Sequence, residues 1–312
     1  MYPVKIDMNI ADTIIRMQSR FPHMRLSNAE EEALFVRRFK NFSYTGNKKP
    51  DIIIIVEIIN SLPQPKEAKD IFITYHPDDG SENWRLSKGK YAYIFKSSAI
   101  AKKQVIFINK TFDRVFAYIL PKDDNKYEWQ VGDIIYDFLQ VLLINYFAQR
   151  RSAVFVHGVG IKDVNNEGYL FAGKSGAGKT TLAKIWEKRT RAMVLNDDRI
   201  IAKKVKDKFL IYGSPWHGNF SDYLDSKIES ARARKLFFIY HSSKNRLKTI
   251  PSQQAFKFLY PAIFPTFWDR GFLDNIISLC HGFVNYAPSF HLGFEKNRKI
   301  IEFVRKIRTG KA

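Results

Sequence analysis

Residues 173–180 read Gly173-Lys174-Ser175-Gly176-Ala177-Gly178-Lys179-Thr180, a complete phosphate-binding loop of the form G-x-x-x-x-G-K-[ST]. Its glycines permit positive φ, so successive backbone N–H groups can converge on phosphate oxygens. An apolar run at 168–172 predicts a short strand before the loop, and the residues after Thr180 predict a helix whose N-terminus favours anions. Strand, loop and helix in this order predict an α/β domain that binds a nucleotide.

The side chains of the loop predict which nucleotide and which metal ion bind. Lys179 is expected to reach the β and γ phosphates, and the Thr180 hydroxyl to bind the Mg²⁺ that bridges them. ATP and Mg²⁺ are therefore the expected cofactors. The expected cofactor-binding residues are Gly173, Lys174, Ser175, Gly176, Ala177, Gly178, Lys179, Thr180 and Thr181.

Two adjacent carboxylates follow the next apolar strand. This strand covers 192–195, and Asp197 and Asp198 come directly after it. One carboxylate can hold metal while the other takes a proton from an attacking hydroxyl. Because neighbouring residues on an extended strand point to opposite sides, both can serve only if the backbone turns there. A solvated turn before Arg199 is the alternative.

Two of the seven histidines lie in glycine-containing segments near these motifs. His157 precedes the strand of the loop, and His217 follows the carboxylates. Each can act near the transferred phosphate or serve as a structural hydrogen-bonding group. The other histidines are interpreted as surface or core residues, and no zinc site is expected; they are His23, His76, His241, His281 and His291.

Four segments, in this order and spacing, resemble the catalytic domain of the HPr kinase/phosphorylase family, whose fold is related to ATP-dependent phosphoenolpyruvate carboxykinase. They are His157-Gly158, the loop 173–180, Asn196-Asp197-Asp198-Arg199 and Gly213-Ser214-Pro215-Trp216-His217-Gly218. The resemblance covers about residues 152–308 and implies an ATP-dependent serine kinase.

By the same resemblance, Lys179 and Thr180 serve the phosphates, Asp197 is the metal-side acid and Asp198 the general base. His157 is placed near the transferred phosphate. Which carboxylate holds the metal is left open. The family's second glycine-rich signature has no counterpart after Gly218, so HPr itself is not the expected acceptor.

The rest of the chain predicts a second domain, as a length of 312 residues suggests. Residues 1–130 are expected to form an antiparallel β-rich domain, with strands at 51–59, 70–75, 90–95, 104–109 and 114–120. A short helix is expected around 11–18. Residues 131–151 are predicted to form a connecting helix and 152–312 the P-loop kinase-like α/β domain, with helices from about Gln253, Trp268 and Asn297.

Composition bears on location and partners. The single cysteine, Cys280, and the lack of a basic-then-apolar leader favour a reducing, cytoplasmic setting, and the longest apolar stretch is too polar to span a membrane. A net charge of +20 fits a lysine-rich surface or an acidic partner better than nucleic acid. Arg232, Arg234 and Arg270 are candidates for holding an acidic acceptor. Homo-oligomerisation stays open.

The leading hypothesis is therefore transfer of the γ-phosphoryl group to a hydroxyl, most plainly a serine, of a peptide or protein. Asp198, His157 and Lys179 are the expected catalytic residues. The first alternative is a non-catalytic, nucleotide-sensing regulatory protein, which binds ATP without transfer. A nucleic-acid-dependent ATPase is a further alternative, but the sequence has no helicase-type motifs to support it.

Overall fold

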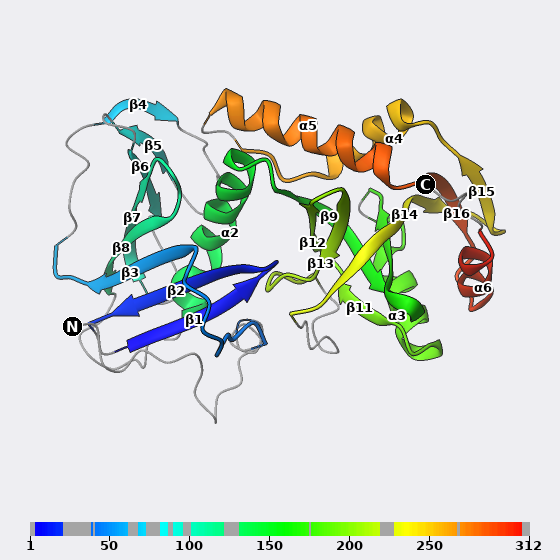
Figure 1. Ribbon diagram of the computed structural model, residues 1–312, viewed down its shortest axis with the longest axis horizontal. Coiled ribbons are helices and arrows are strands. Elements are labelled where there is room, and N and C mark those ends of the chain that lie inside the picture. Colours follow the sequence, from blue (N-terminus) through cyan, green and yellow to red (C-terminus); the bar gives the residue numbers. More distant parts are fainter. Residues whose placement is uncertain are drawn as a thin grey trace. The chain divides into compact units, whose positions relative to one another are not determined.

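The computed structural model describes residues 4–20, 39, 41–61, 68–72, 82–86, 90–95, 101–121, 131–174, 176–218, 228–266 and 269–307. The protein has a mixed α/β fold with two sheets, which confirms the expected fold class. It divides into two compact units (Figure 1). Unit 1 comprises Met1–Gln149 and Thr266–Arg270, and unit 2 comprises Arg150–Pro265 and Gly271–Ala312.

Unit 1 contains an eight-stranded sheet and one long helix. The sheet order is β1-β2-β3-β8-β7-β6-β5-β4. The helix is α2 (Val131–Gln149), and residues 131–151 were expected to link the two domains. The strands are β1 (Val4–Ile10), β2 (Thr13–Ser19), β3 (Ile52–Ile58), β4 (Ala68–Phe72), β5 (Glu82–Leu86), β6 (Lys90–Phe95), β7 (Ala101–Asn109) and β8 (Arg114–Pro121).

This sheet is mixed rather than purely antiparallel as expected. Strand β3 runs parallel to both β2 and β8. Each of these strand pairs is separated by a long stretch of chain, and a parallel pairing needs such a crossover, whereas a hairpin does not. The short β5 was not expected from the sequence, and the last three residues of the strand expected at 70–75 lie outside the described residues.

The helix expected around 11–18 is wrong, because this segment forms a hairpin with β1. Ile10 pairs with Thr13, which leaves the two residues Ala11 and Asp12 as the turn. Both have positive φ, 49° and 56°. A two-residue turn in which both residues have positive φ has a backbone twist that fits the twist of the two antiparallel strands. The signal was hard to detect because neither residue is glycine or asparagine, the usual occupants of this turn.

Unit 2 contains the second sheet, in the order β10-β9-β12-β13-β14-β16-β15, with β11 beside β9 and a further pairing of β10 with β14. Its strands are β9 (Ala153–Lys162), β10 (Glu167–Ala172), β11 (Met193–Asn196), β12 (Arg199–Val205), β13 (Lys208–Tyr212), β14 (Ser230–His241), β15 (Arg246–Thr249) and β16 (Ser289–Phe294). Its helices are α3 (Lys179–Arg189), α4 (Ser252–Leu259), α5 (Arg270–Tyr286) and α6 (Lys299–Arg305), with 3-10 turns at Val164–Asn166 and Tyr260–Ala262.

Several of these elements agree with the sequence-based expectation. The strand expected at 168–172 exists as β10, and it forms a hairpin with the second half of β9. The expected helix starts near Gln253 and Asn297 correspond to α4 and α6. Trp268, the expected start of another helix, lies outside the described residues, and α5 begins at Arg270. Strands β15 and β16 were not expected.

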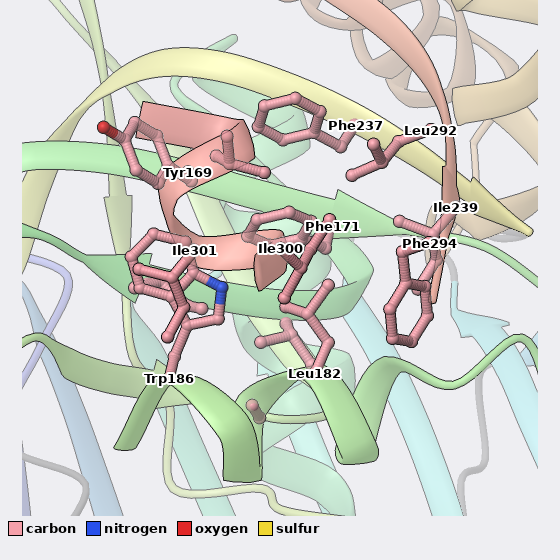
Figure 2. Packing of buried hydrophobic residues seen from close by; sticks show 14 of the residues in the cluster. Tyr169, Phe171, Leu182, Trp186, Phe237, Ile239, Leu292, Phe294, Ile300 and Ile301 are labelled. Carbon is pink, nitrogen blue, oxygen red and sulfur yellow. The ribbon is translucent and has the colours of Figure 1, made fainter. Parts of the chain in front are cut away.

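The sheet of unit 2 is covered on both faces. Helices α3 and α6 pack on one face, where Leu182, Trp186 and Ile300 meet Phe171 and Phe237 of the sheet (Figure 2). On the other face, Phe238 contacts Phe258 of α4, at 5.3 Å between ring centroids. The consecutive apolar residues of β14 are therefore buried on alternate faces, as in a sheet that helices cover on both sides.

The strand directions bring several strand ends to one edge of this sheet. Strands β10, β14 and β16 run parallel to one another. The carboxyl ends of parallel strands lie on the same side, where ligands commonly bind in α/β proteins. The phosphate-binding loop follows the carboxyl end of β10. Across the described part of the chain, the helices are too short or too polar to cross a membrane.

Candidate nucleotide and phosphoryl-transfer site

The phosphate-binding loop connects β10 to α3 as the sequence predicts. Gly176 and Gly178 have φ of 78° and 95°, the left-handed region that favours glycine. A Cβ on Gly178 would also lie 2.9 Å from the ring of Phe294, so the helix start packs directly on β16. Gly178 is the N-cap of α3, and its carbonyl accepts the amide of Leu182 at 2.9 Å. The first N–H groups of a helix have no partner within the helix and point outward from its start, which is the geometry that binds anions.

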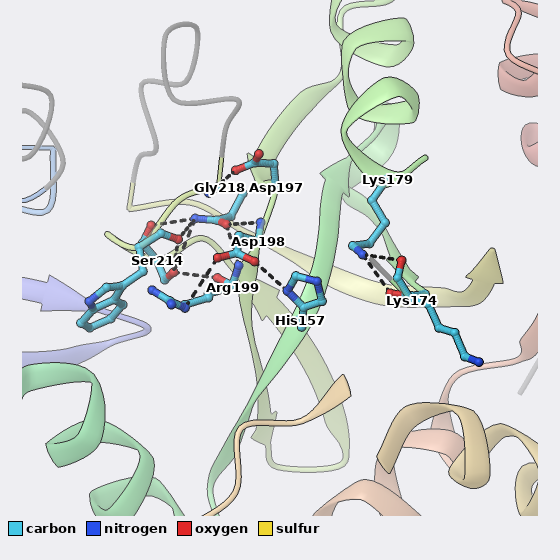
Figure 3. A network of polar contacts seen from close by, with 11 residues as sticks. His157, Lys174, Lys179, Asp197, Asp198, Arg199, Ser214 and Gly218 are labelled. Atoms are coloured by element: carbon cyan, nitrogen blue, oxygen red, sulfur yellow. Dashed lines mark hydrogen bonds and ion pairs between the residues drawn. The ribbon is translucent and has the colours of Figure 1, made fainter. Parts of the chain in front are cut away.

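Lys179 is buried within the loop. Its ammonium donates hydrogen bonds to the carbonyl oxygens of Gly173 at 2.8 Å and Lys174 at 3.1 Å (Figure 3). Burial lowers the pKa of Lys179, and the nearby carboxylate of Asp198 partly opposes this shift. The two side chains are therefore electrostatically coupled.

The acidic couplet occupies a break between two consecutive strands. Both β11 and β12 pair with β9, with Asn196 opposite Gly160 and Arg199 opposite His157. Asp197 and Asp198 lie in the bend between them. The Oδ1 atom of Asn196 accepts the amides of Asp198 and Arg199, each at 2.8 Å, and this fixes the bend. The backbone thus turns where the sequence argument required it.

Glycine at position 158 separates the couplet from the loop. Its amide donates to the carbonyl oxygen of Asp198 at 2.9 Å, and on its other side Gly158 pairs with Ala172, just before the loop. Two strand spacings, about 10 Å, therefore separate the backbones of Asp198 and Ala172. A Cβ on Gly158 would lie 2.8 Å from the carbonyl oxygen of Phe171. The strand between couplet and loop thus carries no side chain at this point.

Asp198 is held between a histidine and an arginine (Figure 3). Oδ1 lies 2.6 Å from Nδ1 of His157, and Oδ2 lies 3.6 Å from Nε of Arg199. Burial by itself raises the pKa of Asp198. The hydrogen bond from His157 and the positive charges of Arg199 and Lys179 outweigh burial, so the pKa lies below its ordinary value of 3.8. Asp198 is therefore ionised at neutral pH.

Asp197 is held differently. It is 4% exposed, and its Oδ1 accepts the amide of Gly218 at 3.0 Å. A Cβ on Gly218 would lie 3.0 Å from Oδ2 of Asp197, so the chain approaches this carboxylate closely. The two acids thus have distinct partners, and their neighbouring positions in the sequence do not make them equivalent.

The segment 213–218 supports the couplet through Asn196. The side-chain amide of Asn196 donates to the carbonyl oxygens of Ser214 and Trp216, each at 2.9 Å, and Nδ1 of His217 lies 3.2 Å away. Ser214 Oγ donates to the carbonyl oxygen of Arg199 at 2.6 Å. This arrangement favours the structural interpretation of His217. The sequence argument mentioned Asn196 without recognising that it organises the site.

One cavity of about 370 Å³ brings these elements together. It is lined by His157, Gly176, Gly178, Lys179, Thr180, Thr181, Asp197, Asp198, Gly218, His241 and Lys296. Of the other expected cofactor-binding residues, Gly173 and Lys174 contact Lys179 through their carbonyl groups, and Ala177 is buried in the core. Ser175 lies outside the described residues.

Two lining residues were missed from the sequence. His241 was interpreted as a surface or core residue, yet its Nε2 lies 2.5 Å from the carbonyl oxygen of Gly176. Lys296 was not among the residues expected at the site. Both residues come at or just after the carboxyl ends of strands parallel to β10. Correct prediction of β14 as the parallel neighbour of β10, and of β16 as the parallel neighbour of β14, would have identified them.

The arginines considered for an acidic acceptor lie elsewhere. Arg232 and Arg234 are in the first part of β14, so Arg232 is about 30 Å along the strand from His241. Arg232 donates to the hydroxyl of Tyr286 at 2.7 Å, and Nε of Arg234 lies 3.8 Å from Glu167. Neither lines the cavity, and Arg270 does not line it either.

The chain matches no family model and no curated protein. Among solved structures it is similar to the Hpr(Ser) kinase/phosphatase from Coxiella burnetii, with 13% identity over 48% of this chain and 93% of that chain. The TM-score is 0.28, which is too low to support an argument about function. The interpretation of the site therefore depends on its own geometry.

Proposed function

We propose that this protein is a Mg²⁺- and ATP-dependent kinase that transfers the γ-phosphoryl group to a hydroxyl of a peptide or protein. The observation that carries the proposal is the shared cavity. A phosphate-binding loop, its lysine and threonine, and an ionised aspartate paired with histidine all line it. A site for binding alone needs the loop, but it does not need a paired carboxylate beside it.

The residues present fit a magnesium-bound triphosphate. Backbone N–H groups at 176–180 and the ammonium of Lys179 would bind phosphate oxygens. The Thr180 hydroxyl and the Asp197 carboxylate are oxygen donors lining the same cavity, and Mg²⁺ prefers such donors together with phosphate oxygens. When bound, the ion neutralises charge on the phosphates. Asp197 suits this role because its carboxylate lines the cavity together with the Thr180 hydroxyl, and the amide of Gly218 fixes its position through Oδ1.

Asp198 would act as the base. The hydroxyl oxygen of the acceptor attacks the γ phosphorus while the bond from that phosphorus to the bridging oxygen of ADP breaks, and the hydroxyl proton passes to Asp198. His157 orients this carboxylate through the 2.6 Å contact. Lys179 compensates the negative charge of the transferring group. Most of the rate enhancement would come from positioning and charge neutralisation.

The proposed phosphoryl acceptor is a hydroxyl group. We propose a serine of a peptide or protein as the acceptor, as the resemblance to HPr kinases implies, because a hydroxyl can give its proton to the carboxylate of Asp198. A net charge of +20 would attract an acidic acceptor.

The test is phosphoryl transfer from γ-labelled ATP with Mg²⁺ to a set of serine, threonine and tyrosine peptides, acidic and basic. Acid-stable label on a hydroxyl is the expected result for the wild type. Asp198→Asn is expected to abolish it, whereas Asp207→Asn, an exposed aspartate in the turn after β12, should not. The nucleotide-sensing alternative would be favoured if the protein binds ATP, labels no acceptor and hydrolyses no ATP.

A further inference from the structure

The cavity has chemically different walls on the two sides of the phosphate-binding loop. Strand β10, which leads into the loop, pairs with β9 on one side and β14 on the other. The β9 side carries His157 and the two carboxylates. The β14 side carries His241, and β16 beyond it leads to Lys296. The loop therefore lies between an acidic wall and a basic wall.

His241 holds the loop at one of its left-handed glycines. Its Nε2 lies 2.5 Å from the carbonyl oxygen of Gly176, and since a carbonyl only accepts, Nε2 carries the hydrogen. The Cε1 atom would also lie 3.5 Å from a Cβ on Gly178. The ring therefore lies beside Gly178 and, through its hydrogen bond, fixes the direction in which the Gly176 carbonyl points.

Lys296 is presented by a turn that has its own hydrogen bonds. The amide of Glu295 donates to Oδ1 of Asn245 at 2.9 Å, and the amide of Asn297 donates to the carbonyl oxygen of Glu295 at 2.7 Å. Oδ1 of Asn297 then accepts the amide of Lys299 at the start of α6. The backbone of Lys296 is therefore fixed on both sides, while its exposed side chain lines the cavity.

The direction of the nucleotide follows if transfer occurs at Asp198. The γ-phosphate must lie at the acidic wall, and the β-phosphate occupies the loop. The α-phosphate and ribose then leave the loop on the other side, toward β14 and β16. A lysine in that position lies on the side of the loop opposite the carboxylates, where the α-phosphate would be.

We propose that Lys296 binds the α-phosphate of the nucleotide and that His241 is a positioning residue, which keeps the Gly176 carbonyl directed away from the phosphates. This inference rests on the proposed function. It adds a second lysine to the site. The turn between β16 and α6 would then determine the affinity for the nucleotide and not the rate of phosphoryl transfer.

The test of Lys296 compares the affinities of Lys296→Met for ATP, ADP and inorganic tripolyphosphate with those of the wild type. We expect the affinities for ATP and ADP to fall by similar factors of about 10, as for a lost charged hydrogen bond. Lys299→Met, an exposed lysine on α6, is the matched control and should change neither. A loss for ATP with none for ADP would place Lys296 at the γ-phosphate and overturn the proposal. Unchanged affinity for both would overturn it as well.

The test of His241 compares His241→Ala with His241→Gln, whose side-chain amide can still donate to the Gly176 carbonyl. We expect the alanine variant to raise the dissociation constant for ATP, measured by equilibrium titration, about 10-fold with little change in kcat, and glutamine to restore most of the lost affinity. A fall in kcat alone, or no rescue by glutamine, contradicts the positioning role. Wild-type protein that binds ATP but transfers no phosphate would overturn the proposed function while the affinity measurements still decide the roles of Lys296 and His241.

Discussion

Nδ1 of His157 lies 2.6 Å from Oδ1 of Asp198, and this contact joins β9 to the bend between β11 and β12 at the cavity that the phosphate-binding loop also lines. The contact gives the two adjacent aspartates separate environments. Asp198 has histidine, arginine and lysine near it, whereas Asp197 accepts a backbone amide. The pair is thus divided between a proton acceptor and a metal ligand in the proposed mechanism, and the predictions below test that division.

Asp198→Asn should separate catalysis from binding. The amide keeps the size of the side chain but cannot accept the hydroxyl proton, so kcat is expected to fall by at least about 10²-fold. The dissociation constant for ATP should change by no more than about twofold. Transfer assays and equilibrium titration measure the two quantities. An unchanged kcat would exclude Asp198 as the base.

Removal of His157 should shift the titration of Asp198. Burial, which raises the pKa of this carboxyl, would remain in His157→Ala, while the hydrogen bond that lowers it would be lost. The acid limb of kcat/KM, set by protonation of the base, should therefore move to higher pH. In the wild type, the stability from the depressed pKa is present above 3.8 and is lost as the pH falls through the folded-state value. A pH–rate profile, supported by carboxyl NMR, provides the measurement, and an unmoved acid limb would contradict the role of His157.

Lys179 should lose its charge at lower pH than an ordinary lysine. Burial lowers its pKa below 10.5, so nucleotide affinity is expected to fall as the pH rises through the lowered value. The carboxylate of Asp198 opposes this shift, and in Asp198→Asn the fall should begin at lower pH still. Titrations with ATP from neutral to alkaline pH test both statements. Coincident pH curves for wild type and variant would show that the two side chains are not coupled.

Gly178→Ala should be more damaging than Gly176→Ala. Both positions have positive φ and impose a cost of about 1–2 kcal/mol on a residue with a Cβ. At Gly178 the added Cβ would also lie 2.9 Å from the Phe294 ring, whereas at Gly176 nothing lies within 4 Å. Thermal unfolding and ATP affinity of the two variants form a matched comparison. Equal effects would mean that packing on β16 is unimportant.

Arg305→Met should destabilise unit 2. Arg305 donates two hydrogen bonds to Asp163, at 2.9 and 2.6 Å, and the carboxylate is only 1% exposed. Loss of the guanidinium would leave this buried carboxylate without its cation, at a cost of about 3 kcal/mol. Urea unfolding followed by circular dichroism measures the change. Lys299→Met, on the same helix, is the control, and equal stabilities of the two variants would contradict the prediction.

The local elements of the site could be predicted from the sequence. The loop 173–180, the strand before it and the helix after it depend on short-range geometry: glycine where φ is positive, an apolar run for the strand, and a helix start for the anion. Asp197 and Asp198 were recognised because they directly follow an apolar strand. For these residues, each choice is set by neighbours within a few positions.

The tertiary structure decided what the strands bring together. Asn196 turns the chain so that both acids line one cavity, where His157 meets Asp198. His241 and Lys296 form the opposite wall. These contacts depend on the order and direction of strands that are distant in sequence. Strand pairing depends on burial on both faces of the sheet and on long connections between strands. A pattern of neighbouring residues in the sequence predicts neither of these. For the same reason the parallel pairings of β3 in unit 1 were missed.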